Sequence, residues 1–166
     1  MIIRNETQSD IEAISEVTQA AFENHPISNN TEQFIVIALR AAKALTISLV
    51  AEVGGQVVGH IAFSPVSISD GSLNWYGLGP ISVAPAHQRQ GFGKALMHEG
   101  LSRLKALGAN GCVLVGDPDY YERFGFRSFP ELMHEGVPPE NLLVLPFGRN
   151  KPQGVVLFHQ SFAAKG

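Results

Sequence analysis

Cysteine, basic charge and long apolar runs are what this sequence has least of. Its 166 residues include one cysteine, Cys112, which excludes an intrachain disulfide. Lysine and arginine number 12 against 15 aspartates and glutamates, so the net charge is −3. A domain that grips nucleic acid over a broad surface normally has a basic excess, and no nucleic-acid partner is therefore expected. An anionic ligand would have to be bound by a local feature.

The hydrophobic segments are short. No apolar run approaches the roughly 18–20 residues that a membrane-spanning helix needs. The N-terminal segment MIIRNETQSD turns polar after three residues, unlike a secretory signal. With 45% hydrophobic and 16% charged residues, the chain has enough apolar material for a core and too few charges for a disordered chain. We therefore expect one cytoplasmic domain, residues 1–166, with no membrane partner.

The hydrophobic pattern predicts an α+β fold with a mixed, mostly antiparallel central sheet flanked by helices. Helical spacing of apolar residues alternates along the chain with β-branched runs bounded by turn residues, including Gly54-Gly55 at a hairpin. The expected helices are 9–22, 31–45, 91–108 and 118–125, with a loop at 24–30 after the first. The expected strands are 1–4, the two arms of the hairpin within 46–68, 73–83, 111–116, 141–147 and 154–162.

Single residues predict where some elements begin or break. Ser9 and Glu12 match the Ser-x-x-Glu capping box of a helix start. Pro80 donates no backbone hydrogen bond within strand 73–83, so strand pairing should lapse there, with a bulge. Cys112 begins the wholly apolar run GCVLVG, which predicts a strand covered on both faces and a buried, inert thiol.

The segment HQRQGFGKAL, residues 87–96, has the chemistry of an anion site. It places two glycines and the cations Arg89 and Lys94 where a loop enters a helix. The first amides of a helix have no intrahelical partner and lie at the positive end of its dipole, and glycine lets a phosphate approach them. Two common nucleotide motifs fail. Ala95 replaces the hydroxyl residue of a Walker A loop, and Leu96 replaces the third glycine of the dinucleotide fingerprint.

Three segments of the sequence together resemble those of a known protein family. QRQGFG reads Gln-x-x-Gly-x-Gly, LGPISVAP is a strand just before it, and YYERFGF follows downstream. Together they resemble the GCN5-related N-acetyltransferase (GNAT) superfamily, and in particular a bacterial subgroup of predicted acetyltransferases. The superfamily binds the pyrophosphate of coenzyme A with an Arg/Gln-x-x-Gly-x-Gly/Ala loop, and it has a Tyr-x-x-x-Gly-Phe segment. The resemblance, which extends to the element order, implies an acyl-CoA N-acyltransferase fold.

The resemblance also implies a reaction and the residues that perform it. An acetyl-CoA-dependent N-acetyltransferase moves the acetyl group to an amine of a small molecule or protein by direct attack. The pantetheine arm would lie along backbone groups of Ile81 and Val83, with the amide of Val83 or a neighbour at the thioester carbonyl. Tyr121 would donate a proton or a hydrogen bond to the departing sulfur, or else simply pack the helix. The implied cofactor-binding residues are Ile81, Ser82, Val83, Gln88, Arg89, Gln90, Gly91, Phe92, Gly93, Lys94 and Tyr121.

The sequence offers several candidates for the group that deprotonates the amine. Some members of the superfamily use a glutamate near the fourth strand, but LNWYGLGPISV has no carboxylate. Asp117 is the nearest carboxylate in sequence and is expected to cap the next helix instead. His60 and His159 are expected to be packed or surface residues, and ordered water is an equal alternative. The superfamily often forms its acceptor pocket near the first helix–helix loop, which here contains Glu23, His25 and Glu32.

Two other kinds of function are alternatives to this interpretation. The missing strand carboxylate keeps a non-catalytic acyl-CoA-binding sensor or interaction domain as the alternative, while nucleotide binding without coenzyme A is disfavoured by Ala95. Neither HEGLS nor HEGVP completes a His-Glu-x-x-His zinc motif, so no metal site is expected. The amine acceptor is unknown, and a homodimer is left open.

Overall fold

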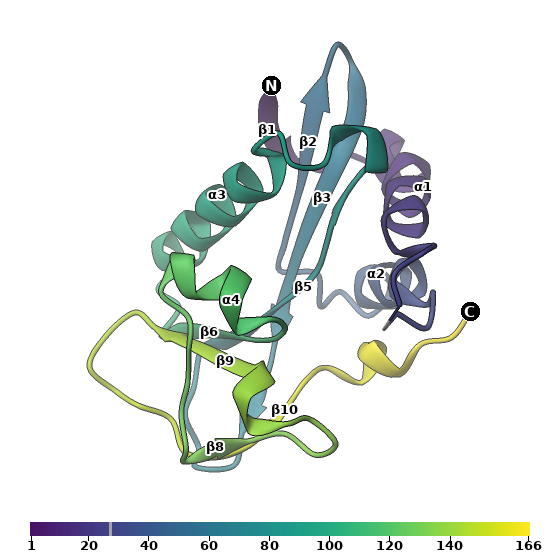
Figure 1. Ribbon diagram of the computed structural model, residues 1–166. Coiled ribbons are helices and arrows are strands. Elements are labelled where there is room, and N and C mark those ends of the chain that lie inside the picture. The colour runs from purple at the N-terminus through teal and green to yellow at the C-terminus, as the bar shows by residue number, and fades with distance from the viewer. Residues whose placement is uncertain (27) are drawn as a thin grey trace.

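A seven-stranded sheet forms the centre of the computed structural model, which describes residues 1–26 and 28–166 (Figure 1). Ile27, within the loop expected at 24–30, lies outside the described residues. The strand order is β1 (Ile2–Asn5), β2 (Ile47–Val53), β3 (Gln56–Pro65), β5 (Trp75–Val83), β6 (Gly111–Val115), β9 (Leu142–Pro146) and β7 (Arg127–Ser128). A three-stranded sheet has the order β4 (Ser67–Ile68), β10 (Gly154–Leu157) and β8 (Leu132–Met133).

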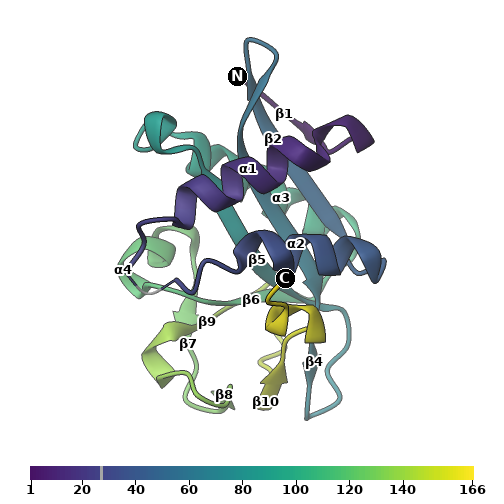
Figure 2. The same ribbon diagram turned by 90° about the vertical axis from the view of Figure 1, so that its right-hand side faces the viewer.

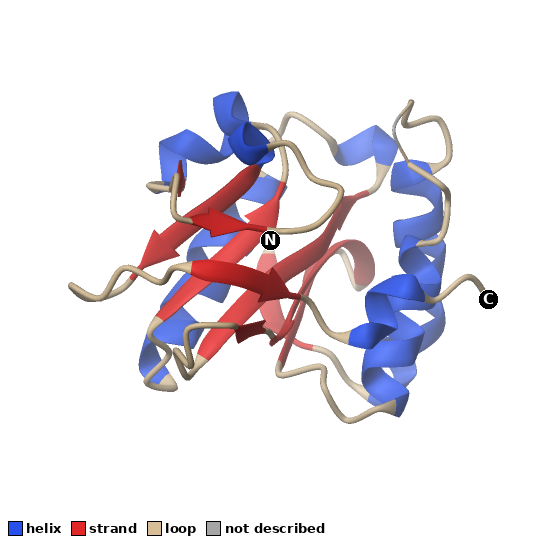
Figure 3. Ribbon diagram, turned by 90° about the horizontal axis from the view of Figure 1, so that it is seen from below, coloured by secondary structure: helices blue, strands red, loops and turns tan. Residues whose placement is uncertain are grey.

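Helices cover both faces of the large sheet. Helices α1 (Ile11–Phe22) and α2 (Glu32–Ala41) lie in front of it in Figure 2, and α3 (Phe92–Ala106) lies behind it. Seen from below in Figure 3, the strands form the middle layer of this arrangement. Helix α4 (Pro118–Tyr121) follows β6, and the C-terminal 3-10 helix (Gln160–Ala163) packs beside α2. The α+β fold with a mostly antiparallel sheet is therefore confirmed.

Two local predictions from the sequence were wrong. The first helix is capped earlier than expected, because Asp10 Oδ2 accepts hydrogen bonds from the Thr7 N–H at 2.7 Å and the Thr7 hydroxyl at 3.0 Å. The capping residues are therefore Thr7 and Asp10, at a short 3-10 turn before α1, and not Ser9 and Glu12. The expected strand 154–162 ends at Leu157, where the chain turns into the C-terminal 3-10 helix. The short strands β7 and β8 were not predicted, and Ser67–Ile68, within the expected hairpin 46–68, forms a separate strand, β4.

The junction of β5 and β6 opens the sheet. These two strands are parallel and pair over three positions, from Trp75–Gly111 to Gly77–Val113, and then diverge. On its other side β5 pairs with β3 in a register that shifts between Ile61 and Phe63, opposite the segment around Pro80. The predicted lapse in pairing at Pro80 is confirmed. Beyond Gly77, one edge of β5 has no strand partner among the described residues.

Close packing holds the strands together below this opening. Trp75, only 2% exposed, lies against Gly111, where a Cβ atom would be 2.3 Å from the indole ring. Trp75 is thus a core residue. The thiol of Cys112 is fully buried, and burial raises its pKa well above its ordinary value. The prediction of a buried, inert cysteine is confirmed.

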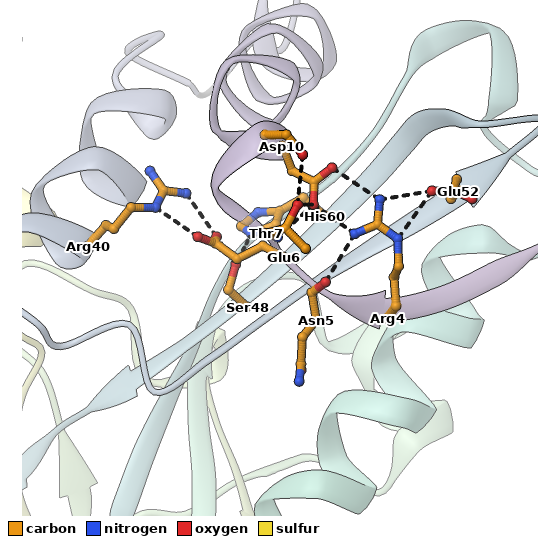
Figure 4. Close-up of polar contacts among 10 residues, drawn as sticks. Arg4, Asn5, Glu6, Thr7, Asp10, Arg40, Ser48, Glu52 and His60 are labelled. Atoms are coloured by element: carbon orange, nitrogen blue, oxygen red, sulfur yellow. Dashed lines mark hydrogen bonds and ion pairs between the residues drawn. The ribbon is translucent and has the colours of Figure 1, made fainter.

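A buried polar chain ties α2 to the sheet (Figure 4). Arg40 donates two hydrogen bonds of 2.9 Å to the Glu6 carboxylate, and the Ser48 hydroxyl donates to the same carboxylate. Because that hydroxyl has one proton, His60 Nε2, 2.7 Å away, must carry its own proton and donate to Ser48. His60 has no exposed surface, and burial lowers its pKa to about 4. It is a packed, neutral histidine.

This histidine predicts a specific loss of stability in mild acid. An unfolded histidine binds a proton below about pH 6.5, whereas folded His60 stays neutral down to about pH 4. The unfolded state therefore binds more protons in this window, and the free energy of unfolding should fall by about 2 kcal/mol from pH 7 to pH 5. Urea denaturation at several pH values measures this change in the free energy of unfolding. In His60→Gln the fall should largely disappear, and an unchanged pH slope would contradict the assignment.

Candidate active site

Two glutamine side chains form hydrogen bonds to backbone carbonyls within the loop between β5 and α3. Gln88 Nε2 donates to the Val83 carbonyl at 3.0 Å, and Gln90 Nε2 donates to the Ala86 carbonyl at 3.2 Å. Arg89 has φ 63° and Gly91 has φ 90°, so the backbone turns sharply just before the helix. The side-chain amides of both glutamines thus shape the loop, while Arg89 is exposed to solvent.

The start of α3 presents unpaired amides next to this loop. Its first intrahelical bond runs from the Ala95 N–H to the Gly91 carbonyl at 3.0 Å. The amides of Phe92, Gly93 and Lys94 precede that bond, at the positive end of the helix dipole. A Cβ atom at Gly93 would lie 3.3 Å from the Tyr120 hydroxyl, so α4 closely approaches this helix start. The predicted anion-binding residues 88–94 are therefore brought together.

Backbone groups of β5 face the opening between β5 and β6. The Ala84 N–H donates to the Val58 carbonyl at 2.8 Å, and backbone groups alternate in direction along a regular antiparallel pair. Ser82 therefore directs its backbone toward β3, and Ile81 and Val83 direct theirs to the free edge. The Val83 carbonyl on that edge is taken by Gln88. Ser82, whose side chain is also buried, is not brought to the opening with the other two.

Tyr121 lies on the opposite wall of the opening and is largely buried. Its ring packs edge-on against Tyr120 and Phe126, with centroids 4.9 Å and 6.1 Å away. A Cβ at Gly116 would be 2.5 Å from the ring, so this glycine makes room for it. Burial, with smaller effects of Tyr120 and Asp117, raises the pKa of Tyr121 to about 12. The phenol is therefore neutral near pH 7, and its O–H is available to donate a hydrogen bond.

Asp117 caps α4, as expected from the sequence. Its Oδ1 accepts a hydrogen bond from the Asp119 N–H at 2.9 Å, and Pro118 occupies the first helical position. The carboxylate therefore has a structural role at the base of the helix that carries Tyr121.

A cavity of about 1060 Å³ begins at this opening and continues toward α1, α2 and the small sheet. Its near walls are the free edge of β5 and the segment from β6 to Tyr121, and its far walls come from α1, α2, the loop after β8 and the C-terminal segment. The near lining includes Leu78, Gly79, Pro80, Ile81, Leu114, Val115, Gly116, Asp117, Tyr120, Tyr121 and Asn141. The far lining is Phe22, His25, Glu32, Ile35, His134, Gly136, Val137, Pro138, Phe158 and Phe162.

Part of this far lining was missed by sequence reasoning. His25 and Glu32 line the cavity as the resemblance implied, and Glu23 is exposed outside the lining. The loop after β8 and the rings of Phe158 and Phe162 were not considered, because nothing local in their sequence connects them to the glycine loop. Among residues 1–26 and 28–166, no group of three or more His, Cys, Asp or Glu side chains is placed to hold a metal ion. In the same residues, no helix combines the length and apolarity needed to cross a membrane.

Comparison with known proteins assigns the family. Residues 2–129 match the sequence model of the Acetyltransferase (GNAT) domain. The Escherichia coli (strain K12) protein called uncharacterized N-acetyltransferase YhbS is 38% identical over 128 residues, which cover 76% of this chain and 74% of YhbS.

Two solved structures have the same fold. A GNAT family acetyltransferase from Brucella melitensis, in complex with acetyl-CoA, has a TM-score of 0.87 and 51% identity, with 97% of each chain covered. E. coli YhbS in complex with CoA has a TM-score of 0.89 and 32% identity, with 99% of this chain and 93% of that chain covered. This chain therefore belongs to the GNAT acetyltransferase family and is an N-acetyltransferase.

Proposed function

We propose that acetyl-CoA binds between the start of α3 and the free edge of β5, and that its acetyl group passes to an amine in the cavity. The single observation that carries this is the continuity of the site. The Tyr120 hydroxyl adjoins Gly93 at the helix start, and Tyr120 also lines the cavity that contains Ile81 and Tyr121. The Brucella relative, at 51% identity, was crystallised with acetyl-CoA, and YhbS with CoA, which supports the same cofactor here.

The proposed chemistry uses groups on both walls of the opening. The pyrophosphate would be bound by the amides of Phe92, Gly93 and Lys94, with help from the charges of Arg89 and Lys94. The pantetheine would lie along Ile81 and Val83 as an added strand, and a free N–H there would stabilise negative charge on the thioester oxygen. As the amine nitrogen bonds to the carbonyl carbon, the C–S bond breaks and the sulfur leaves. Tyr121 would donate a hydrogen bond to that sulfur.

The far lining of the cavity supports a particular class of acceptor. Aromatic rings come from two segments, Phe22 from α1 and Phe158 and Phe162 from the C-terminal segment, and the lining also contains the aliphatic Ile35 and Val137. On the helix side, Glu32 is the carboxylate in the lining, and its Oε1 accepts a hydrogen bond from the Ser28 hydroxyl at 2.6 Å. We propose that the acceptor is a primary amine with one positive charge and an apolar or aromatic body.

This acceptor class predicts an order of reactivity. Release of CoA from acetyl-CoA should be measured with phenethylamine and a phenylalanine-initiated peptide on one side, and spermidine and kanamycin on the other. Burial of an aromatic ring is worth about 1.5–3 kcal/mol, so kcat/KM should be about 10-fold or more higher for the aromatic monoamines. Faster reaction with spermidine would contradict the acceptor class and leave acetyl transfer intact. Acetyl-CoA binding without CoA release for any amine would instead support the sensor alternative.

The location and the oligomeric state of the protein stay predictions. The cytoplasmic location is inferred from composition alone. Neither the composition nor the fold indicates a homodimer. Sedimentation of the purified chain at several concentrations would determine its oligomeric state.

A further inference from the structure

The lining of the cavity includes six titratable side chains, which differ in their ability to accept a proton from an amine. Asp117 caps α4, and Glu32 is engaged by the Ser28 hydroxyl. Burial raises the pKa of both Tyr120 and Tyr121, so neither phenol is a base near neutral pH. The other two titratable groups in the lining are the imidazoles of His25, from the α1 end, and His134, just after β8.

His134 is held in one tautomer. Its Nδ1 lies 2.8 Å from the Val156 carbonyl in β10. A carbonyl oxygen can only accept, so Nδ1 carries the proton of the neutral ring and Nε2 keeps its lone pair. The ring also packs edge-on against Phe158, with the centroids 5.0 Å apart and the planes at 81°. Parallel pairing of β8 with β10, which lie together in Figure 1, fixes the backbone on both sides of this contact.

The packing of His134 places it in the same cavity as the proposed thioester site. A Cβ at Gly77 would be 2.9 Å from the Phe158 ring, so Phe158 lies at the last paired position of β5 and β6. His134 packs on this ring and faces the same cavity as Tyr121, which lies on the wall beyond β6. An amine in the cavity would thus have a basic nitrogen on one side and the thioester on the other.

We propose that His134 Nε2 removes the proton from the acceptor ammonium, a role that rests on the proposed acetyl transfer. The ammonium gives one proton to Nε2, and the freed lone pair attacks the thioester carbonyl carbon. When the C–S bond breaks, the sulfur leaves with the bonding electrons. The second amine proton passes to the thiolate, directly or through solvent, while His134 returns its proton to solvent. The balanced products are the N-acetylated amine, free CoA and one proton.

The variant His134→Asn isolates the basic nitrogen. The asparagine Nδ2 occupies nearly the place of the histidine Nδ1 and can still donate to the Val156 carbonyl, whereas nothing replaces Nε2. With the best amine of the panel above, kcat/KM at pH 7 should fall about 100-fold or more. The acid limb of the wild-type pH profile should vanish in the variant, and the loss should shrink at high pH, where the amine is already neutral. The affinity for CoA should not change.

Two controls make the outcome decisive. His98→Asn removes an exposed histidine on α3 and should leave both the rate and the acid limb unchanged. His25→Asn tests the other cavity histidine. An unchanged rate and pH profile in His134→Asn, or loss of the acid limb in His25→Asn alone, would overturn the role of His134 while leaving acetyl transfer intact. Absence of CoA release by the wild-type protein with every amine would overturn the proposed function, and this role with it.

Discussion

Gly91→Glu should abolish binding of CoA to an otherwise folded protein. Gly91 lies at the start of α3, exposed and with φ 90°. Its two chain neighbours aside, no heavy atom of the described residues lies within 4 Å of the position of an added Cβ. A glutamate there would place a negative charge beside the proposed pyrophosphate site. At about 4 Å and a surface dielectric near 20, the repulsion is about 4 kcal/mol, so the Kd for CoA should rise by roughly 100-fold or more. Isothermal titration calorimetry measures it.

A matched variant separates charge from backbone strain. Gly91→Gln has the same length and the same left-handed backbone cost, of about 1–2 kcal/mol, but no charge. Its Kd should rise much less than that of Gly91→Glu, and addition of salt should narrow the difference between the two variants. Equal affinity of wild type and Gly91→Glu, with both folded by circular dichroism, would show that the phosphates bind elsewhere.

The cofactor half of the site could be predicted because its residues are close in sequence. Residues 88–94 form one loop and one helix start, and the spacing of Gly91 and Gly93 is a property of the chain itself. Tyr121 was found in the same way, four residues before Gly125, whose φ of 96° ends the short helical segment. Ser82 shows the limit of this reasoning. Its position beside Ile81 and Val83 in sequence says nothing about the direction of its backbone, which pairing with β3 determines.

The acceptor half could not be predicted, because it is assembled from distant segments. His134, Phe158 and Phe162 come from strands and turns of two to four residues, too short to leave a periodic pattern. They also lie beyond residue 129, where the match to the family ends. The pairing of β8 with β10, together with the packing of the C-terminal 3-10 helix beside α2, brings them to the cavity at the opening of β5 and β6. The proposed acceptor site therefore lies largely in the part of the chain with the weakest sequence signal.

Tyr121→Phe should lower turnover about 10- to 100-fold with little effect on CoA affinity. Phenylalanine keeps the ring that packs against Phe126 and fills the space left by Gly116. Only the hydroxyl is lost, and a hydrogen bond to a charged sulfur is worth about 1.5–3 kcal/mol. Because the pKa of Tyr121 is raised to about 12, well above that of a thiol, donation of a hydrogen bond fits this group better than complete proton transfer. Steady-state kinetics, together with the Kd for CoA, measure the two effects.

The neighbouring tyrosine provides the contrast that assigns this role. The hydroxyl of Tyr120 lies against Gly93 at the start of α3. Tyr120→Phe should therefore act mainly on CoA affinity and leave turnover at saturating acetyl-CoA nearly unchanged. If the two variants exchanged these effects, Tyr120 would be the donor to the sulfur. If neither lowered turnover, both rings would serve only to pack α4, and the thiolate would leave without help from a phenol.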